Sequence, residues 1–194
     1  ALRRQGYLLH TRRRSYRHFS DSPPVYRQSQ WPTLPLEAEH LVSESHVVRA
    51  ALQMLDRNGD LIGVYDKNFP IITETTEAGI LCGSDAPLIE CDFGRVGAVI
   101  CFDLNFSEIR QRYEQARPDL LIFPSMYHGG LMQAYWDYAC RAHLVTAVCG
   151  LSSAILSPVG NELASTTNYF DFAVAEVNLD CQLAHLDFNW DKLR

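Results

Sequence analysis

The sequence lacks any apolar run close to the roughly 20 residues that a membrane-spanning helix needs, so it predicts no membrane span and no membrane partner. The six cysteines form no CxxC pair and the seven histidines show no metal-ligand spacing, so we expect no metal site. No internal repeat or low-complexity tract occurs. The widely spaced cysteines, mostly in apolar runs, favour reduced, buried thiols over a disulfide framework.

Basic residues are scarce outside the start of the chain. Residues 1–28 hold seven arginines and one acidic residue, whereas the rest holds ten basic and 22 acidic residues. An acidic body argues against nucleic acid as the main partner, because phosphate binding needs clustered cations. The basic segment has three interpretations: a solvated arm, the remnant of an organellar transit peptide, or a patch for nucleic acid or anionic membrane. We expect a cytoplasmic protein, or a mitochondrial one if the second interpretation holds.

The sequence divides into a poorly patterned basic segment, residues 1–45, and one domain, residues 46–194. The domain begins with a hairpin, because two apolar runs, 50–55 and 61–65, flank the turn signal Asn58-Gly59. Strands and helices then alternate, which is typical of a layered α/β domain. Further strands are predicted at 88–91, 95–101, 120–123, 144–149, 152–157 and 172–179, a segment at 162–165 that pairs with 152–157, and helices at 106–116 and 131–143.

Cys101 ends an apolar strand a few residues before a helix for which Asn105 and Glu108 form a predicted capping pair. A side chain on such a sharp strand-to-helix turn is presented at the carboxyl edge of the sheet, where α/β ligand sites lie. The helix N-terminus favours a thiolate, and nearby amides, beginning with that of Phe102, are placed to receive an oxyanion. The alternative is a packed core thiol, against which the polar neighbours, Asp103 among them, argue.

Several motifs of this chain resemble those of the nitrilase, or carbon–nitrogen hydrolase, superfamily. The nucleophile motif is matched by residues 94–108, GRVGAVICFDLNFSE, although the family often has proline where this chain has Ser107. Its lysine motif is matched by residues 64–70, VYDKNFP, which contain Lys67. Residues 55–63, LDRNGDLIG, and 119–125, DLLIFPS, are also similar to family segments.

The resemblance implies a four-layer α-β-β-α sandwich and a triad of Glu, Lys and Cys. Cys101 would attack an amide or nitrile carbon, Lys67 would stabilise the tetrahedral intermediate, and a thioester would form and hydrolyse. The family also implies a second glutamate in the loop after the lysine. Glu77 is the first choice for it and Glu74 the reserve. The resemblance also implies that the substrate is a small amide or, less often, a nitrile or carbamoyl compound, and that the reaction needs no cofactor. A homo-oligomer is the expected assembly.

The upstream glutamate of the triad has no good match. Glu37, Glu39 and Glu44 precede Lys67, but none follows a buried apolar strand. We therefore expect the family's N-terminal part to be missing, and the sandwich to be incomplete at that end. This leaves a second hypothesis open, a truncated non-catalytic member that binds small amides or acts as a subunit partner.

Three further residues have weaker signals. Tyr127 and His128 follow the strand at 120–123 and are candidates for the pocket wall. A packed aromatic and a surface or core histidine are the alternatives for these two positions. Cys140 lies on the predicted helix 131–143 in step with its apolar face, so we expect it to serve packing.

Overall fold

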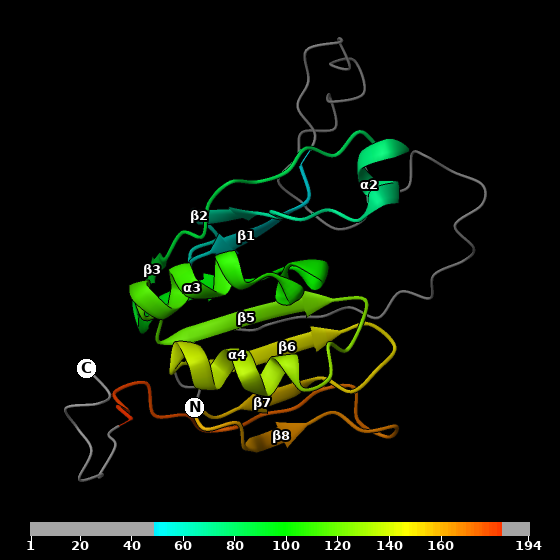
Figure 1. Ribbon diagram of the computed structural model, residues 1–194. Helices are drawn as coiled ribbons and strands as arrows, with labels where there is room; N and C mark the ends of the chain where they lie inside the picture. Colours follow the sequence, from blue (N-terminus) through cyan, green and yellow to red (C-terminus); the bar gives the residue numbers. More distant parts are fainter. Residues whose placement is uncertain (1–48, 184–194) are drawn as a thin grey trace, which may run out of the picture.

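The computed structural model describes residues 49–183, as one helix layer, one six-stranded sheet and one β-hairpin (Figure 1). The predicted segment 1–45 lies outside the described residues, as do Glu37, Glu39 and Glu44. No helix within residues 49–183 is long and apolar enough to cross a membrane. The hairpin comprises β1 (Ala51–Leu55) and β2 (Leu61–Asp66); the sheet comprises β3 (Ile89–Cys91), β4 (Gly94–Ala98), β5 (Leu120–Ser125), β6 (His143–Val148), β7 (Ala154–Leu156) and β8 (Glu162–Ser165).

The sheet has the strand order β3-β4-β5-β6-β7-β8. β4, β5 and β6 run parallel, and the flanking strands pair antiparallel. The connection from β4 to β5 contains a 3₁₀ turn, η3 (Cys101–Asn105), and the helix α3 (Ser107–Ala116), which confirms the predicted βαβ unit. The helix α4 (Met132–Cys140) connects β5 to β6. The carboxyl ends of three parallel strands therefore meet at one edge of the sheet.

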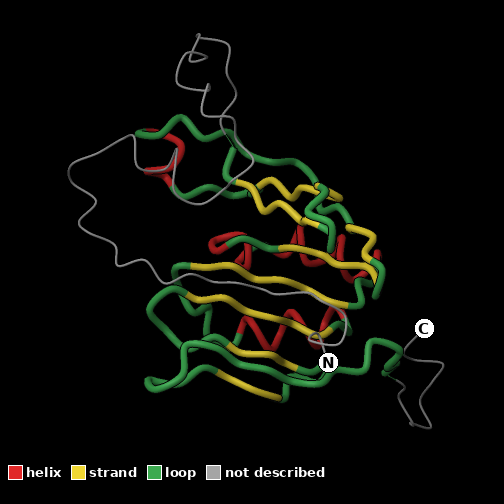
Figure 2. The backbone as a smooth tube through the Cα atoms, turned by 180° about the vertical axis from the view of Figure 1, so that it is seen from behind, coloured by secondary structure: helices red, strands yellow, loops and turns green. Residues whose placement is uncertain are grey.

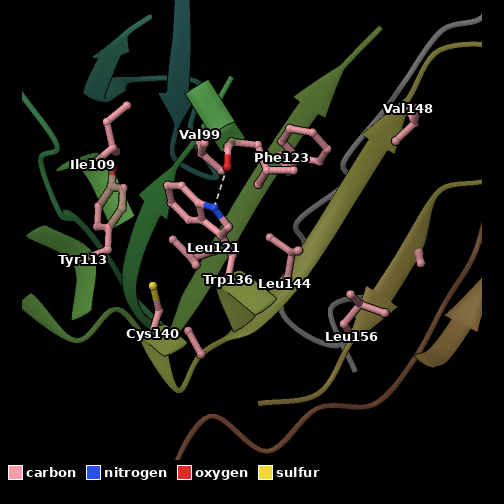
Figure 3. Packing of buried hydrophobic residues seen from close by; sticks show 13 residues of the cluster. Val99, Ile109, Tyr113, Leu121, Phe123, Trp136, Cys140, Leu144, Val148 and Leu156 are labelled. Carbon is pink, nitrogen blue, oxygen red and sulfur yellow. Dashed lines mark hydrogen bonds between the residues drawn. The ribbon is translucent and has the colours of Figure 1, made fainter. Parts of the chain in front are cut away.

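One face of the sheet packs against α3 and α4, and the main core lies between them (Figures 1 and 3). Side chains alternate along β5, so Leu121 and Phe123 point to the helices. Trp136 of α4 is fully buried there, and its Nε1 donates a hydrogen bond to the carbonyl oxygen of Leu104 at 2.7 Å. This bond ties the helix layer to the turn that begins at Cys101.

The hairpin packs against the opposite face of the sheet. Leu52 and Met54 of β1 contact the cluster of Val96, Leu120 and Ile122. The order of layers is thus helices, sheet, hairpin, and these are three of the four layers that the predicted sandwich contains. Figure 2 shows the hairpin as a separate pair of strands beside the larger sheet, near β3.

The hairpin, the paired strand at 162–165 and the helix after Cys101 confirm their predictions, but four details are wrong. Residues 172–179 form no strand, because no described strand pairs with them. β5 continues through Pro124 to Ser125 instead of ending before it. The N-cap of α3 is Phe106, since Asn105 belongs to η3. The helix predicted to reach residue 143 ends at Cys140, and His143 begins β6.

The loop after Lys67, at residues 68–87, contains a short helix, α2 (Ile72–Thr76). It follows Lys67 closely and, in Figure 1, lies on the side of the hairpin away from β3. No hydrophobic period marks this single turn, so the sequence carried no signal for it.

Candidate active site

Cys101 stands at the carboxyl edge of the sheet, although the strand predicted to reach it, β4, ends three residues earlier at Ala98. The backbone of Cys101 has φ 49°, in the left-handed region that residues with a side chain rarely adopt. The next residues turn tightly in η3 before α3 begins, and the side chain is half-buried. This strained backbone forms the sharp turn that the sequence predicts. The turn places the thiol beside the carboxyl ends of the parallel strands.

The residue after Cys101, Phe102, has a backbone N–H group without a hydrogen-bond acceptor among the described residues. The N–H of Asp103, in contrast, is already bonded to the carbonyl oxygen of Ile100. An unpaired amide beside a nucleophile is a suitable donor to a developing oxyanion. The sequence-predicted oxyanion donor therefore has an available proton.

Lys67 follows β2 and is almost fully buried, at 2% exposed. Its Nζ lies 2.6 Å from Oε2 of Glu74, and the same oxygen accepts a hydrogen bond from the N–H of Ile71. A buried ammonium needs such a partner, because an unpaired charge in the interior is costly. The short helix α2 holds the carboxylate in place, since Glu74 lies in its first turn.

Glu77 lies elsewhere. It is the exposed C-cap residue of α2, and its N–H donates to the carbonyl oxygen of Thr73. The structure thus brings the reserve candidate, Glu74, into contact with Lys67 and leaves the first choice, Glu77, at the surface. Both lie in one polar loop, and nothing in the local sequence distinguishes them.

Asp103 connects the lysine segment with the cysteine turn. Its side chain is fully buried and accepts hydrogen bonds from the Tyr65 hydroxyl at 2.7 Å and from the Phe69 N–H at 2.6 Å. The N–H groups of Asn68 and Ile100 donate to it at 3.3 and 3.4 Å. Burial raises the pKa of Asp103 above its ordinary value, and the four hydrogen bonds offset only part of this rise.

Aromatic rings reinforce the same junction. The ring of Phe69 stacks on that of Phe106, with centroids 3.6 Å apart and planes 7° from parallel. Phe102 meets Phe106 edge-on at 5.4 Å. The segment that carries Lys67 and the segment that carries Cys101 are therefore joined by polar and by apolar contacts.

Tyr127 faces the cysteine turn from the end of β5. Its hydroxyl accepts a hydrogen bond from Nδ2 of Asn105 at 2.9 Å, and Asn105 also donates to the carbonyl oxygen of Phe102. Burial raises the pKa of Tyr127, and charges on Cys101 and Asp103 raise it further. Among residues 49–183 the phenol oxygen acts only as an acceptor, so no described residue takes the hydroxyl proton that a ligand could receive.

The remaining candidates, His128 and Cys140, form no hydrogen bond with Lys67 or Cys101 in the described part of the chain. His128 is exposed, and its Nδ1 accepts a hydrogen bond from the N–H of Gly130. Cys140 is 1% exposed in the main core, where burial raises its pKa to about 12, so it fits the packing role. Among residues 49–183, no three His, Cys, Asp or Glu side chains gather to hold a metal ion.

Three residues support the candidate site through hydrogen bonds but were not predicted from the sequence: Tyr65, Asn68 and Ser125. Asn68 Nδ2 bonds the Tyr65 hydroxyl and the carbonyl oxygen of Asp85, and Ser125 Oγ bonds the backbone of Tyr127 in both directions. Tyr65 and Asn68 lie within the lysine motif, so their closeness to Lys67 in the sequence was the only feature that could have marked them as site residues.

Comparison with known proteins gives consistent results. The sequence profile of the carbon–nitrogen hydrolase family matches residues 28–180. A human deaminated glutathione amidase is 23% identical over 109 residues, which cover 52% of this chain and 33% of the relative. A chloroplastic omega-amidase of Arabidopsis thaliana is 24% identical over 135 residues, covering 60% of this chain and 37% of the relative. The chain thus spans about a third of the length of these curated relatives.

One similar solved structure is a mutant amidase from Nesterenkonia sp. AN1, with the acetamide moiety of fluoroacetamide covalently added at the active-site cysteine. It has a TM-score of 0.52 and 17% identity, and the match covers 59% of this chain and 49% of that one. At this identity the likeness concerns the fold, and it agrees with the layers described above.

Proposed function

Because this chain belongs to the carbon–nitrogen hydrolase family, we propose that the protein hydrolyses the carbon–nitrogen bond of a small amide through a thioester on Cys101. The observation that carries the proposal is the left-handed turn at Cys101, joined through Asp103 to the segment of a buried lysine. The names of the relatives, deaminated glutathione amidase and omega-amidase, favour an amide over a nitrile.

The first half-reaction transfers the acyl group to sulfur. The thiol of Cys101 gives its proton to a carboxylate and attacks the carbonyl carbon, forming the C–S bond. The negative charge on the carbonyl oxygen is stabilised by the N–H of Phe102 and the ammonium of Lys67. The C–N bond then breaks, and the nitrogen takes the proton from the carboxylic acid and leaves as ammonia or an amine.

The second half-reaction releases the acid. A water molecule attacks the thioester carbon and gives a proton to the carboxylate. The C–S bond then breaks, and the carboxylic acid returns that proton to the departing sulfur, which regenerates the cysteine thiol. Of the carboxylates in the described residues, Glu74 lies against Lys67, so we assign it the place that the sequence interpretation assigns first to Glu77. The family resemblance implies a further glutamate upstream of Lys67, for which this sequence offers no good match.

The test combines turnover with labelling. The full chain is incubated with butyramide, and ammonia and butyrate are measured, while fluoroacetamide is used to label the thiol, with displacement of fluoride. We expect ammonia release and a Cys101 adduct in the wild type, and neither in Cys101→Ser. Cys149→Ser is the matched control, because it removes an exposed cysteine just after β6 and should leave both results unchanged.

The second candidate, a non-catalytic amide binder, is favoured by the absence of a good upstream match to the family's first glutamate. A Cys101 adduct without any acid release from butyramide, deaminated glutathione or other small amides would support this candidate instead. Turnover retained in Cys101→Ser would remove the thioester mechanism altogether.

A further inference from the structure

The buried carboxylate of Asp103 has no role in the chemical steps proposed above. This group is fully buried, yet it forms no ion pair with any cation in residues 49–183. Burying a carboxylate without a cation is unfavourable unless hydrogen-bond donors replace the lost water. Such an arrangement in a small domain suggests a role beyond filling space.

The donors to Asp103 bracket Lys67 in the sequence. Tyr65 lies two residues before the lysine, and Asn68 and Phe69 lie one and two residues after it. The fourth donor, the N–H of Ile100, comes from the residue just before Cys101. One carboxylate therefore holds the tyrosine side chain before the lysine, the backbone after the lysine and the backbone next to the cysteine.

In all four contacts an oxygen of Asp103 is the hydrogen-bond acceptor. Oδ1 receives the Phe69 N–H, and Oδ2 receives the Tyr65 hydroxyl and the N–H groups of Asn68 and Ile100. An ionised carboxylate satisfies both sides, whereas an asparagine offers one oxygen and would turn its NH₂ group toward donors on the other side. The geometry thus suits a charged aspartate and no neutral isostere.

We propose that Asp103 is a positioning residue that sets the place of the Lys67 ammonium relative to the Cys101 thiol. This inference rests on the proposed function and adds a residue to it that does not touch the substrate. Displacing a catalytic group by about 1 Å can cost about 100-fold in rate, so the link between the two segments has direct consequences for turnover.

Asp103→Asn is the principal variant. We expect kcat for butyramide to fall about 100-fold with KM little changed, because the substrate does not contact Asp103. We also expect slower alkylation of Cys101 by fluoroacetamide. The matched control is Asp119→Asn, since Asp119 accepts the Arg95 N–H at the opposite edge of the same sheet. The control should leave kcat and alkylation unchanged.

A double-mutant cycle with Lys67→Met separates positioning from a general structural role. If Asp103 acts through the lysine, Asp103→Asn should change the alkylation rate less than about twofold once Lys67 is already replaced, because coupled residues are non-additive. Equal effects in both backgrounds would overturn the inference, as would a folded Asp103→Asn variant with wild-type kcat and alkylation rate.

Tyr65→Phe covers the case in which Asp103→Asn does not fold. It removes a single donor to the carboxylate and keeps the ring, so we expect a fall of about 2- to 10-fold in kcat or in the alkylation rate. An unchanged Tyr65→Phe would then overturn the inference. If the wild type turns over no amide, the proposed function fails, while the alkylation rates still decide the role of Asp103.

Discussion

The backbone of Cys101 is held in a conformation that costs a residue with a Cβ atom about 1–2 kcal/mol. The turn at Gly129-Gly130 also needs positive φ, but there glycine adopts it without that cost. A cysteine kept at a position where glycine would be more stable points to a need for the thiol. This reasoning leads to a test on stability that is independent of activity.

We expect Cys101→Gly to unfold with a free energy about 1 kcal/mol higher than that of Cys101→Ala, because glycine relieves the left-handed strain. Both variants remove the thiol, so each serves as the control for the other. Urea denaturation followed by circular dichroism measures the difference. Equal stabilities would mean that the turn relaxes at no cost when the cysteine is replaced.

Asp137 is a second unusual residue. It is fully buried on α4, and neither carboxylate oxygen has a hydrogen-bond partner in the described part of the chain. Burial raises the pKa of its carboxyl group from 3.8 to about 7. The folded state therefore favours the neutral acid.

The sign of the pH effect follows from linkage. The unfolded chain releases this proton near pH 4 and the folded chain only near pH 7, so the free energy of unfolding falls as pH rises across that window. We expect Asp137→Asn to remove most of this pH dependence. Its free energy of unfolding, relative to that of the wild type, should therefore increase by on the order of 2–4 kcal/mol from pH 4 to pH 8. Thermal melts at both pH values measure it, and parallel pH profiles would contradict it.

At the scale of elements, both long helices end in the same way. Arg117 closes α3 with φ 54°, and Arg141 closes α4 with φ 56°. Glycine is the usual residue at such a left-handed helix end, because it has no Cβ atom to clash. The two arginines therefore reduce stability slightly where the chain must turn back into a strand.

We expect Arg141→Gly to raise the free energy of unfolding by about 0.5–1 kcal/mol, since glycine removes the strain. Gln111→Gly is the control, because Gln111 is exposed in the interior of α3, where glycine should lower stability by about 1 kcal/mol. Chemical denaturation of both variants gives the comparison. A loss of stability in Arg141→Gly would show that the arginine side chain makes a stabilising contact.

At the scale of the whole molecule, charge is the most informative property. The chain carries a formal charge of −6, and its arginines cluster in the first 28 residues. A negative body repels phosphate, and the basic segment attracts it, so the two parts oppose each other in any binding to nucleic acid.

We expect the full chain to bind duplex DNA no more tightly than about 10⁻⁴ M at about 0.15 M salt, the weak end of non-specific binding. Fluorescence anisotropy of a labelled duplex, titrated with the protein, measures this. Micromolar binding that weakens steeply with salt would instead favour the interpretation of residues 1–28 as a nucleic-acid patch. A variant with those arginines replaced by glutamine would then lose the binding.

Local patterns were sufficient to predict much of this molecule. The Asn58-Gly59 turn, the βαβ unit and the sharp turn at Cys101 all arise from backbone preferences and apolar periods that act over a few residues. The motifs around Lys67 and Cys101 led to the family that the match over residues 28–180 then showed.

Contacts between distant segments were beyond such patterns. Glu74 and Glu77 are chemically alike, and only the path of the chain through α2 brings the first of them to Lys67. Residues 172–179 have strand-forming side chains but form no strand, because a strand requires a hydrogen-bonding partner that its own sequence does not supply. Likewise, three of the four hydrogen bonds of Asp103 join residues 34 to 38 positions apart, so they exist only once the lysine segment has packed beside the cysteine turn.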